Sequence, residues 1–450
     1  MTVQRSRWRL ARRTFWADEA TLVGGDPFRS LRLTTRGAAF VHEVLAGRRQ
    51  ARSESELALL QRLARANLLV APTRTACTDG SVTVVVPAKS GADAVQSVLD
   101  AAPGVPAIVI DDGSPEPLAA RLHHNADLRV LRNATSLGPA TARNQGARLA
   151  TTRWVAFCDA DILAPSQWID ALLPYAADNL AVAPRIITAA EETAAGRFER
   201  AVCALDMGEV PGYVSPTGVL SYLPSAALLV ERAGFLALGG FDETMTVGED
   251  VDLSWRAASA GVYYEPAVVL EHRPRARLTD ALSRRAVYGR SAAALSEKHP
   301  DLMRHGSFPV AAALPWLLAM AGRPRWAAAA SAAHIALAPR SMPGLPASAA
   351  RRAAASGQAR STLALSRMLT RPLLPLSVAA SLPSRGFRRR AALAAAASTL
   401  VRTRSIPAAA WQLLDDAAYS AGAWQAAVHV RRPGFLLPQL RSGGGRGRAR

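Results

Sequence analysis

The runs Val82-Thr-Val-Val-Val-Pro-Ala88 and Val105-Pro-Ala-Ile-Val-Ile-Asp-Asp-Gly-Ser114 decide the fold. Each is a stretch of apolar, largely β-branched residues that ends at polar or turn-forming residues, as strands buried on both faces do. Leu128–Leu131 and Trp154–Cys158 repeat the pattern. Helices are expected between and after these strands, at about 92–102, 116–126, 139–151 and 165–177. The alternation predicts an α/β fold of Rossmann type, with a mostly parallel sheet and helices on both faces.

Acidic clusters directly follow two of these strands. Asp111-Asp112-Gly113-Ser114 follows the second strand, and Asp159-Ala160-Asp161 follows the fourth. In such sheets, ligands bind beyond the carboxyl ends of the strands. The sequence therefore predicts an active site at this edge of the sheet.

Asp159 and Asp161 are the clearest candidates for a metal site. In an extended chain, residues i and i+2 point the same way, so both carboxylates can share one divalent cation that also binds phosphate oxygens. Such a cation would neutralise a diphosphate leaving group. An isolated Asp-x-Asp is usually a solvated loop, but its position after a buried strand favours the functional interpretation.

The Asp111 and Asp112 carboxylates are candidates to accept hydrogen bonds from a nucleobase or from ribose hydroxyls. The alternative is a helix start capped by Ser114, with Pro115 and Glu116 in the first turn. We expect both to hold, because a cap at Ser114 leaves the aspartates free.

A helix expected after the turn at Gly138-Pro139 carries a further candidate, Arg143, which is placed to reach phosphate oxygens. Asn144 and Gly146 on the same helix are expected to serve packing instead.

Glu249 and Asp250 open another expected helix, which runs through Ala260 and stops at Gly261. The helix dipole favours the charged form of a carboxylate at this position, which suits Asp250 as a general base. The alternative is an ordinary acidic first turn.

His272 is a candidate metal ligand or phosphate contact, although a lone histidine is more often structural.

Composition limits the class of protein. The chain has 450 residues, half of them hydrophobic, which allows two to four domains with sizeable cores. Its three cysteines, Cys77, Cys158 and Cys203, exclude a disulfide framework and indicate a reducing compartment. The arginines near the N-terminus are followed by Asp18 and Glu19 instead of an apolar run, so no signal peptide is expected and residues 1–300 should stay in the cytoplasm.

Residues 1–76 are expected to form a small module of short strands and helices. One helix is expected over 36–46, capped by Thr35 and closed by Gly47, and another over the leucines from Leu57 to Leu68. A winged-helix-like unit and a helical cap on the next domain are equally compatible with the pattern.

The catalytic domain is expected over residues 80–300. Within it, the uncharged segment 210–230 is broken by prolines and glycines, which predicts loops and a core strand.

Residues 301–450 hold 21 arginines, no lysine and three acids, so they carry +18 of the net charge of +19. Short apolar stretches lie between the arginines, and none is long enough for a confident membrane span. They suit helices that lie at an anionic membrane surface. The alternatives are an Ala-rich helical bundle packed on the enzyme and an RNA-binding region, but the aromatic residues are not interleaved with arginine as base stacking needs. The Gly/Arg-rich end, 441–450, is expected to be disordered.

Together these motifs resemble family 2 glycosyltransferases over roughly Val82 to Pro300. Their order carries the resemblance: Val-Val-Val-Pro-Ala, Asp-Asp-Gly-Ser, Leu-Gly-Pro-Ala with Ala-Arg-Asn, Asp-Ala-Asp, Gly-Gly-Phe-Asp-Glu and Glu-Asp-Val-Asp-Leu. The resemblance implies a GT-A-like fold and an inverting transfer from a nucleotide sugar. It implies the following roles: Pro87, Ala88, Asp111 and Asp112 in the nucleotide site, Asp159 and Asp161 on the donor and its Mg2+ or Mn2+, Asp250 as base, and Glu249 on the acceptor side.

Leu253-Ser-Trp-Arg256 stands where the large processive synthases have Gln-x-x-Arg-Trp, which argues against a long polymer product. The whole-chain layout is most similar to the members of this family that serve mycofactocin biosynthesis. That similarity implies UDP-glucose as donor, a small peptide-derived acceptor and an oligoglucoside of a redox cofactor as product. We hypothesise that residues 1–76 recognise the acceptor or a partner protein. The alternatives are a lipid or cell-envelope acceptor, and a catalytically inactive nucleotide-binding scaffold at the membrane; nucleic-acid binding is not expected.

Overall fold

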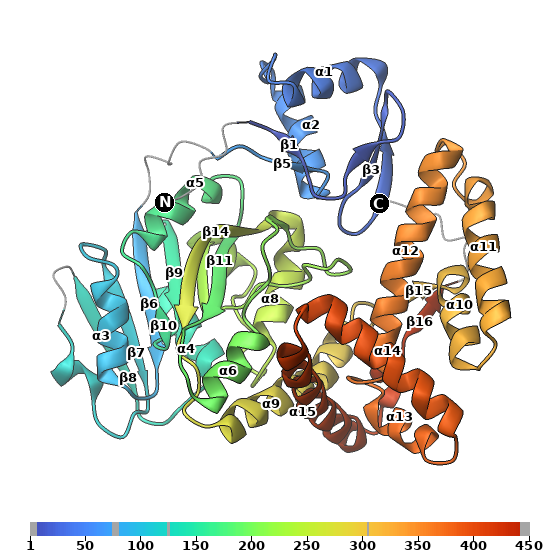
Figure 1. Ribbon diagram of the computed structural model, residues 1–450. Coiled ribbons are helices and arrows are strands. Elements are labelled where there is room, and N and C mark those ends of the chain that lie inside the picture. The colour runs from blue at the N-terminus through green and yellow to red at the C-terminus, as the bar shows by residue number, and fades with distance from the viewer. Residues whose placement is uncertain (1–6, 74–80, 124–126, 304–305, 442–450) are drawn as a thin grey trace. The chain divides into compact units, whose positions relative to one another are not determined.

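The computed structural model describes residues 7–73, 81–123, 127–303 and 306–441, and Cys77 and the tail after Arg441 lie outside them. The chain forms two compact units, residues 1–191 with 203–274 and residues 192–202 with 275–450 (Figure 1). The second unit therefore begins before residue 300, the end expected for the catalytic domain.

In the first unit, the part that follows residue 80 is built on a mixed sheet with the order β10-β14-β11-β13-β9-β6-β7-β8, and β12 pairs with β14. The four strands expected from the sequence pair in parallel, in the order β9-β6-β7-β8. The α/β prediction is thus confirmed, while β13 runs antiparallel to β9 and β11. The strands of this sheet are β6 (Val82–Ala88), β7 (Ala107–Asp112), β8 (Leu128–Asn133), β9 (Trp154–Cys158), β10 (Ile162–Leu163), β11 (Ala181–Thr188), β12 (Gly212–Tyr213), β13 (Ala227–Glu231) and β14 (Val262–His272).

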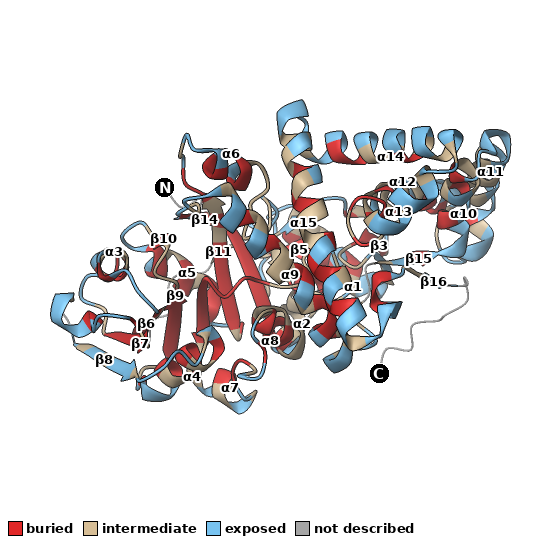
Figure 2. Cartoon of the chain, turned by 90° about the horizontal axis from the view of Figure 1, so that it is seen from below, coloured by how far each residue is buried: buried red, intermediate tan, exposed pale blue. Residues whose placement is uncertain are grey.

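Helices cover both faces of this sheet, whose strands are largely buried (Figure 2). Alternate residues of β6 serve opposite faces: Val84 and Val86 join one core cluster, and Val85 joins the other. The helices and 3-10 turns of this part are α3 (Ala92–Asp100), η1 (Leu118–Arg121), α4 (Pro139–Leu149), α5 (Trp168–Ala176), α7 (Arg232–Ala237), α8 (Glu249–Ala257) and η2 (Ala258–Ala260).

The prediction of a helix over residues 116–126 is wrong. Among the described residues of that segment, only η1 is helical. The N–H of Leu118 donates to the Asp111 carboxylate at 3.1 Å, and Pro115 and Pro117 have no N–H to donate. By contrast, α8 with η2 ends at Gly261 as expected, and segment 210–230 contains loops and the core strand β13.

Residues 7–73 form a module with its own apolar core, which includes Leu22, Val41, Leu60 and Leu63. β2, β3 and β4 make an antiparallel sheet, and β1 pairs with β5. The cap of α1 is Thr34, one residue before the expected Thr35, and its side chain accepts the N–H of Gly37 at 3.1 Å. The elements are β1 (Arg9–Leu10), β2 (Phe15–Trp16), β3 (Thr21–Gly24), β4 (Arg29–Arg32), α1 (Thr35–Leu45), α2 (Glu54–Arg65) and β5 (Leu69–Val70).

In its described residues the second unit is mainly helical, and the short strands β15 and β16 pair in parallel. Within the part that the structure describes, no helix is both long and apolar enough to cross a bilayer. Its elements are α6 (Ala194–Ala201), α9 (Leu278–Lys298), β15 (Ser307–Pro309), α10 (Val310–Met320), α11 (Pro324–Ser341), α12 (Ala347–Met368), α13 (Leu374–Ser381), α14 (Arg385–Thr403), α15 (Ile406–Val430), η3 (Pro433–Leu436) and β16 (Gln439–Arg441).

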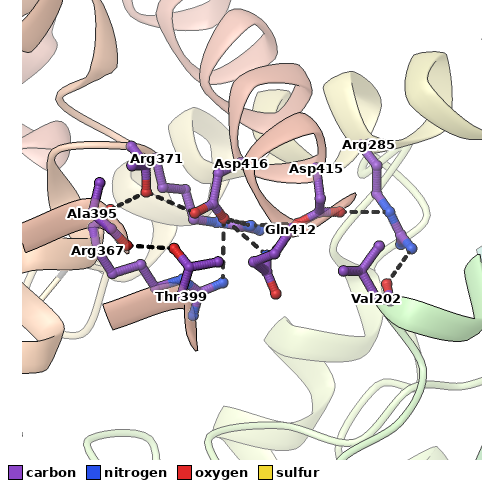
Figure 3. A network of polar contacts seen from close by, with 10 residues as sticks. Val202, Arg285, Arg367, Arg371, Ala395, Thr399, Gln412, Asp415 and Asp416 are labelled. Atoms are coloured by element: carbon purple, nitrogen blue, oxygen red, sulfur yellow. Dashed lines mark hydrogen bonds and ion pairs between the residues drawn. The ribbon is translucent and has the colours of Figure 1, made fainter. Parts of the chain in front are cut away.

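A buried ionic network connects α15 to α9, to α12 and to the turn that follows α12 (Figure 3). Asp415 pairs with Arg285 of α9 at 2.8 Å, and Arg371 lies 2.8 Å from Asp415 and 2.9 Å from Asp416. Arg367 of α12 lies 3.6 Å from Asp416. Removing one partner of a buried ion pair costs about 3–5 kcal/mol, because it leaves an uncompensated buried charge. Two of the three acids of residues 301–450 are used here, so most of the basic charge of this region has no acidic counterpart within it.

Candidate active site

The ends of β7 and β8 and the start of α4 form one hydrogen-bonded corner around Asp112. Its carboxylate accepts the backbone N–H groups of Leu137 and Gly138 at 2.8 and 2.9 Å. It also accepts side-chain hydrogen bonds from Asn133 and Ser136, each at 2.8 Å. Burial raises the pKa of Asp112, but these hydrogen bonds outweigh it, and the pKa is lowered. Asp112 therefore holds the Gly138 turn, which positions α4.

Asp111 is engaged in a similar way. Its carboxylate accepts the Ser114 N–H at 2.9 Å, the Ser114 hydroxyl at 2.5 Å, the Leu118 N–H at 3.1 Å and Arg132 at 2.8 Å. Burial acts to raise its pKa, yet the hydrogen bonds from Ser114 and Leu118 and the charge of Arg132 lower it overall.

The expectation that Ser114 caps a helix and leaves both aspartates free is wrong. The Ser114 hydroxyl donates to Asp111 and lies 2.6 Å from the Glu116 carbonyl, and no helix starts there. A short loop after a strand lets a carboxylate satisfy the neighbouring backbone N–H groups, and both aspartates do so. Ala88 pairs in register with Asp111, so Pro87 and Ala88 end β6 beside this corner.

Arg143 of α4 joins the two acidic motifs that lie far from it in sequence. Its guanidinium donates to Asp159 at 2.5 Å and to Glu249 at 3.4 Å. Its side chain is 4% exposed, and burial acts to lower its pKa, but the charges of Asp159, Glu249 and Asp250 raise the pKa overall. Arg143 was predicted to reach phosphate oxygens; here its charge neutralises carboxylates and brings β9 and α8 into one site.

The pKa values of Asp159 and Asp250 are both raised toward neutral pH. Burial raises the pKa of Asp159 to about 6, with Arg143 acting against the shift and Asp161 adding to it. Burial, followed by the neighbouring charge of Glu249, raises the pKa of Asp250 to about 7, against a hydrogen bond from the Val251 N–H at 2.8 Å. A carboxylate with a pKa near 7 is suited to proton transfer at neutral pH.

Asp161 points to the last residue of β14. Its carboxylate lies 3.0 Å from His272 Nε2, and the register pairs His272 with Ile162 of β10. The Asp161 side chain is 46% exposed, whereas His272 is largely buried. His272 therefore contacts Asp161 from its buried side and orients the carboxylate.

Across the described ranges, there is no group of three or more His, Cys, Asp or Glu side chains that could hold a metal ion. The interpretation of His272 as a metal ligand or phosphate contact stays a prediction, and in the structure its Nε2 lies 3.0 Å from the Asp161 carboxylate. Two carboxylates still fit Mg2+ or Mn2+, which commonly bind one or two protein carboxylates and take their other ligands from phosphates and water.

Asn144 and Gly146 pack α4 as predicted. Asn144 exchanges hydrogen bonds with the backbone of Phe241, at 2.8 and 2.9 Å, and a Cβ at Gly146 would collide with Val85. Sequence reasoning missed Glu243, which accepts from Asn144 at 2.9 Å and fastens the Gly-Gly-Phe-Asp-Glu loop to α4. The signal was present in that motif, but spacing alone did not indicate a partner.

Comparison with known proteins provides an independent view of the chain. Residues 83–213 match the family described as Glycosyl transferase family 2. The pre-mycofactocin glycosyltransferase of Mycobacterium tuberculosis is 32% identical over 457 aligned residues, which span 94% of this chain and 95% of that protein. Succinoglycan biosynthesis protein ExoU of Rhizobium meliloti is 31% identical over 215 residues, 42% of this chain and 60% of that protein. A solved mannosyltransferase from Pyrobaculum calidifontis, in complex with GDP-Man and Mn2+, aligns with a TM-score of 0.43 and 18% identity, over 77% of this chain and 86% of that one.

Proposed function

The chain belongs to the family 2 glycosyltransferases, and on that premise we propose that it is an inverting, metal-dependent enzyme that transfers glucose from UDP-glucose to a small peptide-derived acceptor. The observation that carries the proposal is the position of Arg143, which contacts Asp159 after β9 and Glu249 at the start of α8. The buried Arg143 guanidinium thus brings the Asp-Ala-Asp motif and the Glu249-Asp250 pair, which contains the candidate base, into a single site.

In the proposed mechanism, Asp250 accepts the proton of the acceptor hydroxyl. The hydroxyl oxygen then bonds to the anomeric carbon while the bond from that carbon to the diphosphate breaks on the opposite face. The products are the inverted glycoside, nucleoside diphosphate and a protonated Asp250. Its pKa of about 7 suits both the uptake of this proton and its later release to solvent.

Asp159 and Asp161 would hold Mg2+ or Mn2+, which when bound neutralises the charge of the leaving diphosphate. His272 keeps Asp161 oriented through the 3.0 Å contact. Pro87, Ala88, Asp111 and Asp112 would line the nucleotide site at the ends of β6 and β7. Because both aspartates are engaged, we propose that they shape this site mainly by holding its loops.

The acceptor proposal rests on the Mycobacterium tuberculosis relative, whose name states that it acts on pre-mycofactocin. Leu253-Ser-Trp-Arg256 in α8 supports a short oligoglycoside over a long polymer. A lipid or cell-envelope acceptor is the second candidate. An inactive scaffold is disfavoured because Asp159, Asp161, Glu249 and Asp250 are all present around one site.

The experiment that tests the function incubates the purified protein with Mg2+ or Mn2+ and a panel of nucleotide sugars, and follows release of nucleoside diphosphate by mass spectrometry. We expect cleavage of UDP-glucose above the other donors, and more of it when pre-mycofactocin is added. Absence of binding and cleavage with every donor would overturn the proposal in favour of the scaffold. Cleavage that responds to a polyprenyl phosphate instead would favour the lipid acceptor.

We further propose that the second unit lies at the inner face of an anionic membrane. In α14, Ala391, Ser398 and Thr399 are buried, whereas Leu393 and Val401 are 71% and 57% exposed. Exposed arginines 388 and 389 precede this apolar face. An amphipathic helix with basic flanks is suited to a negatively charged bilayer surface.

The prediction is that the protein floats with vesicles of phosphatidylcholine and phosphatidylglycerol, and that Leu393→Gln with Val401→Gln reduces the bound fraction severalfold. Pure phosphatidylcholine vesicles should bind less, because they carry no net negative charge. A matched control is Leu149→Gln, which changes an exposed apolar side chain in the first unit and leaves α14 unchanged. Equal flotation of the double variant and the wild type would contradict the proposed face.

A further inference from the structure

Two side chains of the N-terminal module contact β12 and the loop that follows it. The Asp26 carboxylate accepts the Val219 N–H at 2.9 and 2.8 Å from its two oxygens, and the Leu220 N–H at 3.2 Å. The Asn67 amide donates to the Tyr213 carbonyl at 2.9 Å and accepts the Tyr213 N–H at 2.8 Å. Asn67 also donates to the Asp26 carbonyl at 3.1 Å. The two contacts are thus coupled within the module.

At both contacts, the residue just before the contacted one is a glycine: Gly218 precedes Val219, and Gly212 precedes Tyr213. A Cβ at Gly218 would lie 2.7 to 2.8 Å from the atoms of the Asp26 carboxylate. A Cβ at Gly212 would lie 2.8 Å from Asn67 Oδ1. Real Cβ atoms essentially never approach a neighbour so closely, so a side chain at either glycine would force the Asp26 carboxylate or the Asn67 amide to move from its present contact.

The loop contacted by Asp26 continues directly to the active site. We call residues 214–226 the bridging segment. The Ser221 carbonyl accepts a hydrogen bond from Trp255 Nε1 at 2.9 Å, and the Leu223 N–H donates to Ser254 Oγ at 3.1 Å. At its end, the Ala226 carbonyl accepts the Asp159 N–H at 2.8 Å.

These contacts place the bridging segment beside the candidate base. Ser254 lies four residues after Asp250 on α8, and residues i and i+4 share one face of a helix. Leu220 and Leu223 pack in the same core cluster as Leu253 of that helix. A displacement of the segment at Val219 would therefore reach both α8 and the backbone of Asp159.

We propose that Asp26 is a positioning residue for the acceptor: through the bridging segment, the N-terminal module holds the acceptor-side wall of the site next to Asp250. The inference rests on the proposed function for the identity of the acceptor. The segment has no charged residue, and Ser215, Thr217 and Ser221 on it are at least partly exposed. Such a wall suits a neutral acceptor that carries hydroxyl and amide groups.

The first test measures transfer and donor hydrolysis in Asp26→Ala. We expect the KM for the acceptor to rise about tenfold, as the loss of a hydrogen-bonded charged group predicts, while donor hydrolysis without acceptor stays near the wild-type rate. Asp26→Asn keeps one oxygen that accepts hydrogen bonds, so its KM for the acceptor should lie between those of the wild type and of Asp26→Ala. The matched control is Asp18→Ala, because Asp18 accepts the N–H groups of Ala20 and Thr21 within the module, at 2.9 and 2.8 Å.

A second test uses the glycine opposite Asp26. Gly218→Ala introduces a methyl group against the carboxylate and should reproduce the acceptor defect of Asp26→Ala. The double variant should be no worse than Asp26→Ala alone, because the methyl group then has room. Additive losses in the double variant would mean that the two positions act independently and would overturn the proposed contact.

Hydrogen exchange distinguishes failure of this inference from failure of the proposed function. In Asp26→Ala, the amides of Val219, Leu220 and Asp159 should exchange faster than in the wild type and in Asp18→Ala. Unchanged exchange at these amides, or an unchanged acceptor KM in an enzyme that transfers glucose, would overturn the inference. Faster exchange in a protein that transfers no sugar would support the positioning role and count against the proposed function alone.

Discussion

In the Asp250→Asn variant, sugar transfer is expected to fall by roughly a thousandfold, because a positioned general base contributes on that order. Donor binding should persist, since the substitution leaves Asp159 and Asp161 intact. Folding should also persist: burial and the charge of Glu249 disfavour the charged form of Asp250, so a neutral amide of the same shape does not remove a stabilising charge. Steady-state kinetics, donor titration and thermal unfolding measure the three expectations separately.

The pH profile provides a more specific readout. The raised pKa of about 7 means that Asp250 is protonated below this pH and is unable to accept the acceptor proton. We therefore expect kcat/KM to rise with pH and to level off above about 7. Glu249→Gln removes the neighbouring negative charge, so the pKa of Asp250 should fall and the rise should move to lower pH.

The residual activity of Asp250→Asn should lack this rise altogether. Transfer within about tenfold of the wild type, with the same pH profile, would exclude Asp250 as the base.

Asp161→Ala is expected to abolish cleavage of the donor in the presence of Mg2+ or Mn2+. Loss of an orienting partner of a metal ligand typically costs about 10- to 100-fold, and loss of the ligand itself should cost more. Asp161 is the more exposed carboxylate of its motif, whereas one oxygen of Asp159 is held by Arg143. Removing Asp161 therefore removes the carboxylate with the better access to an incoming cation.

Two variants make this result interpretable. His272→Asn removes only the group that orients Asp161, so its loss should be about 10- to 100-fold and smaller than that of Asp161→Ala. Asp170→Ala changes an exposed carboxylate at the start of α5 and should leave donor cleavage unchanged. Donor cleavage and metal titration in all three variants test the order. Wild-type cleavage by Asp161→Ala would exclude Asp161 from the donor site.

Local sequence predicted the strands β6, β7, β8 and β9 well, because a short apolar run bounded by turn residues is typical of a strand. It failed where a side chain competes with helix formation. At 116–126 the Asp111 carboxylate satisfies the Ser114 and Leu118 N–H groups, and no regular helix follows. The contact between His272 and Asp161 was not predicted, because the two residues lie 111 positions apart in the chain.

The sequence by itself determined the α/β architecture, the sheet edge that carries the acidic motifs and the family resemblance, because each depends on residues that are neighbours in the chain. Only the tertiary structure decided which charges meet. Arg143 finds Asp159 and Glu249, which lie 16 and 106 positions away, and Asp26 finds Val219 at a separation of 193. Such contacts form because a buried charge or an unpaired backbone N–H must find a partner once water is excluded, and the packing of the whole unit determines which partner is within reach.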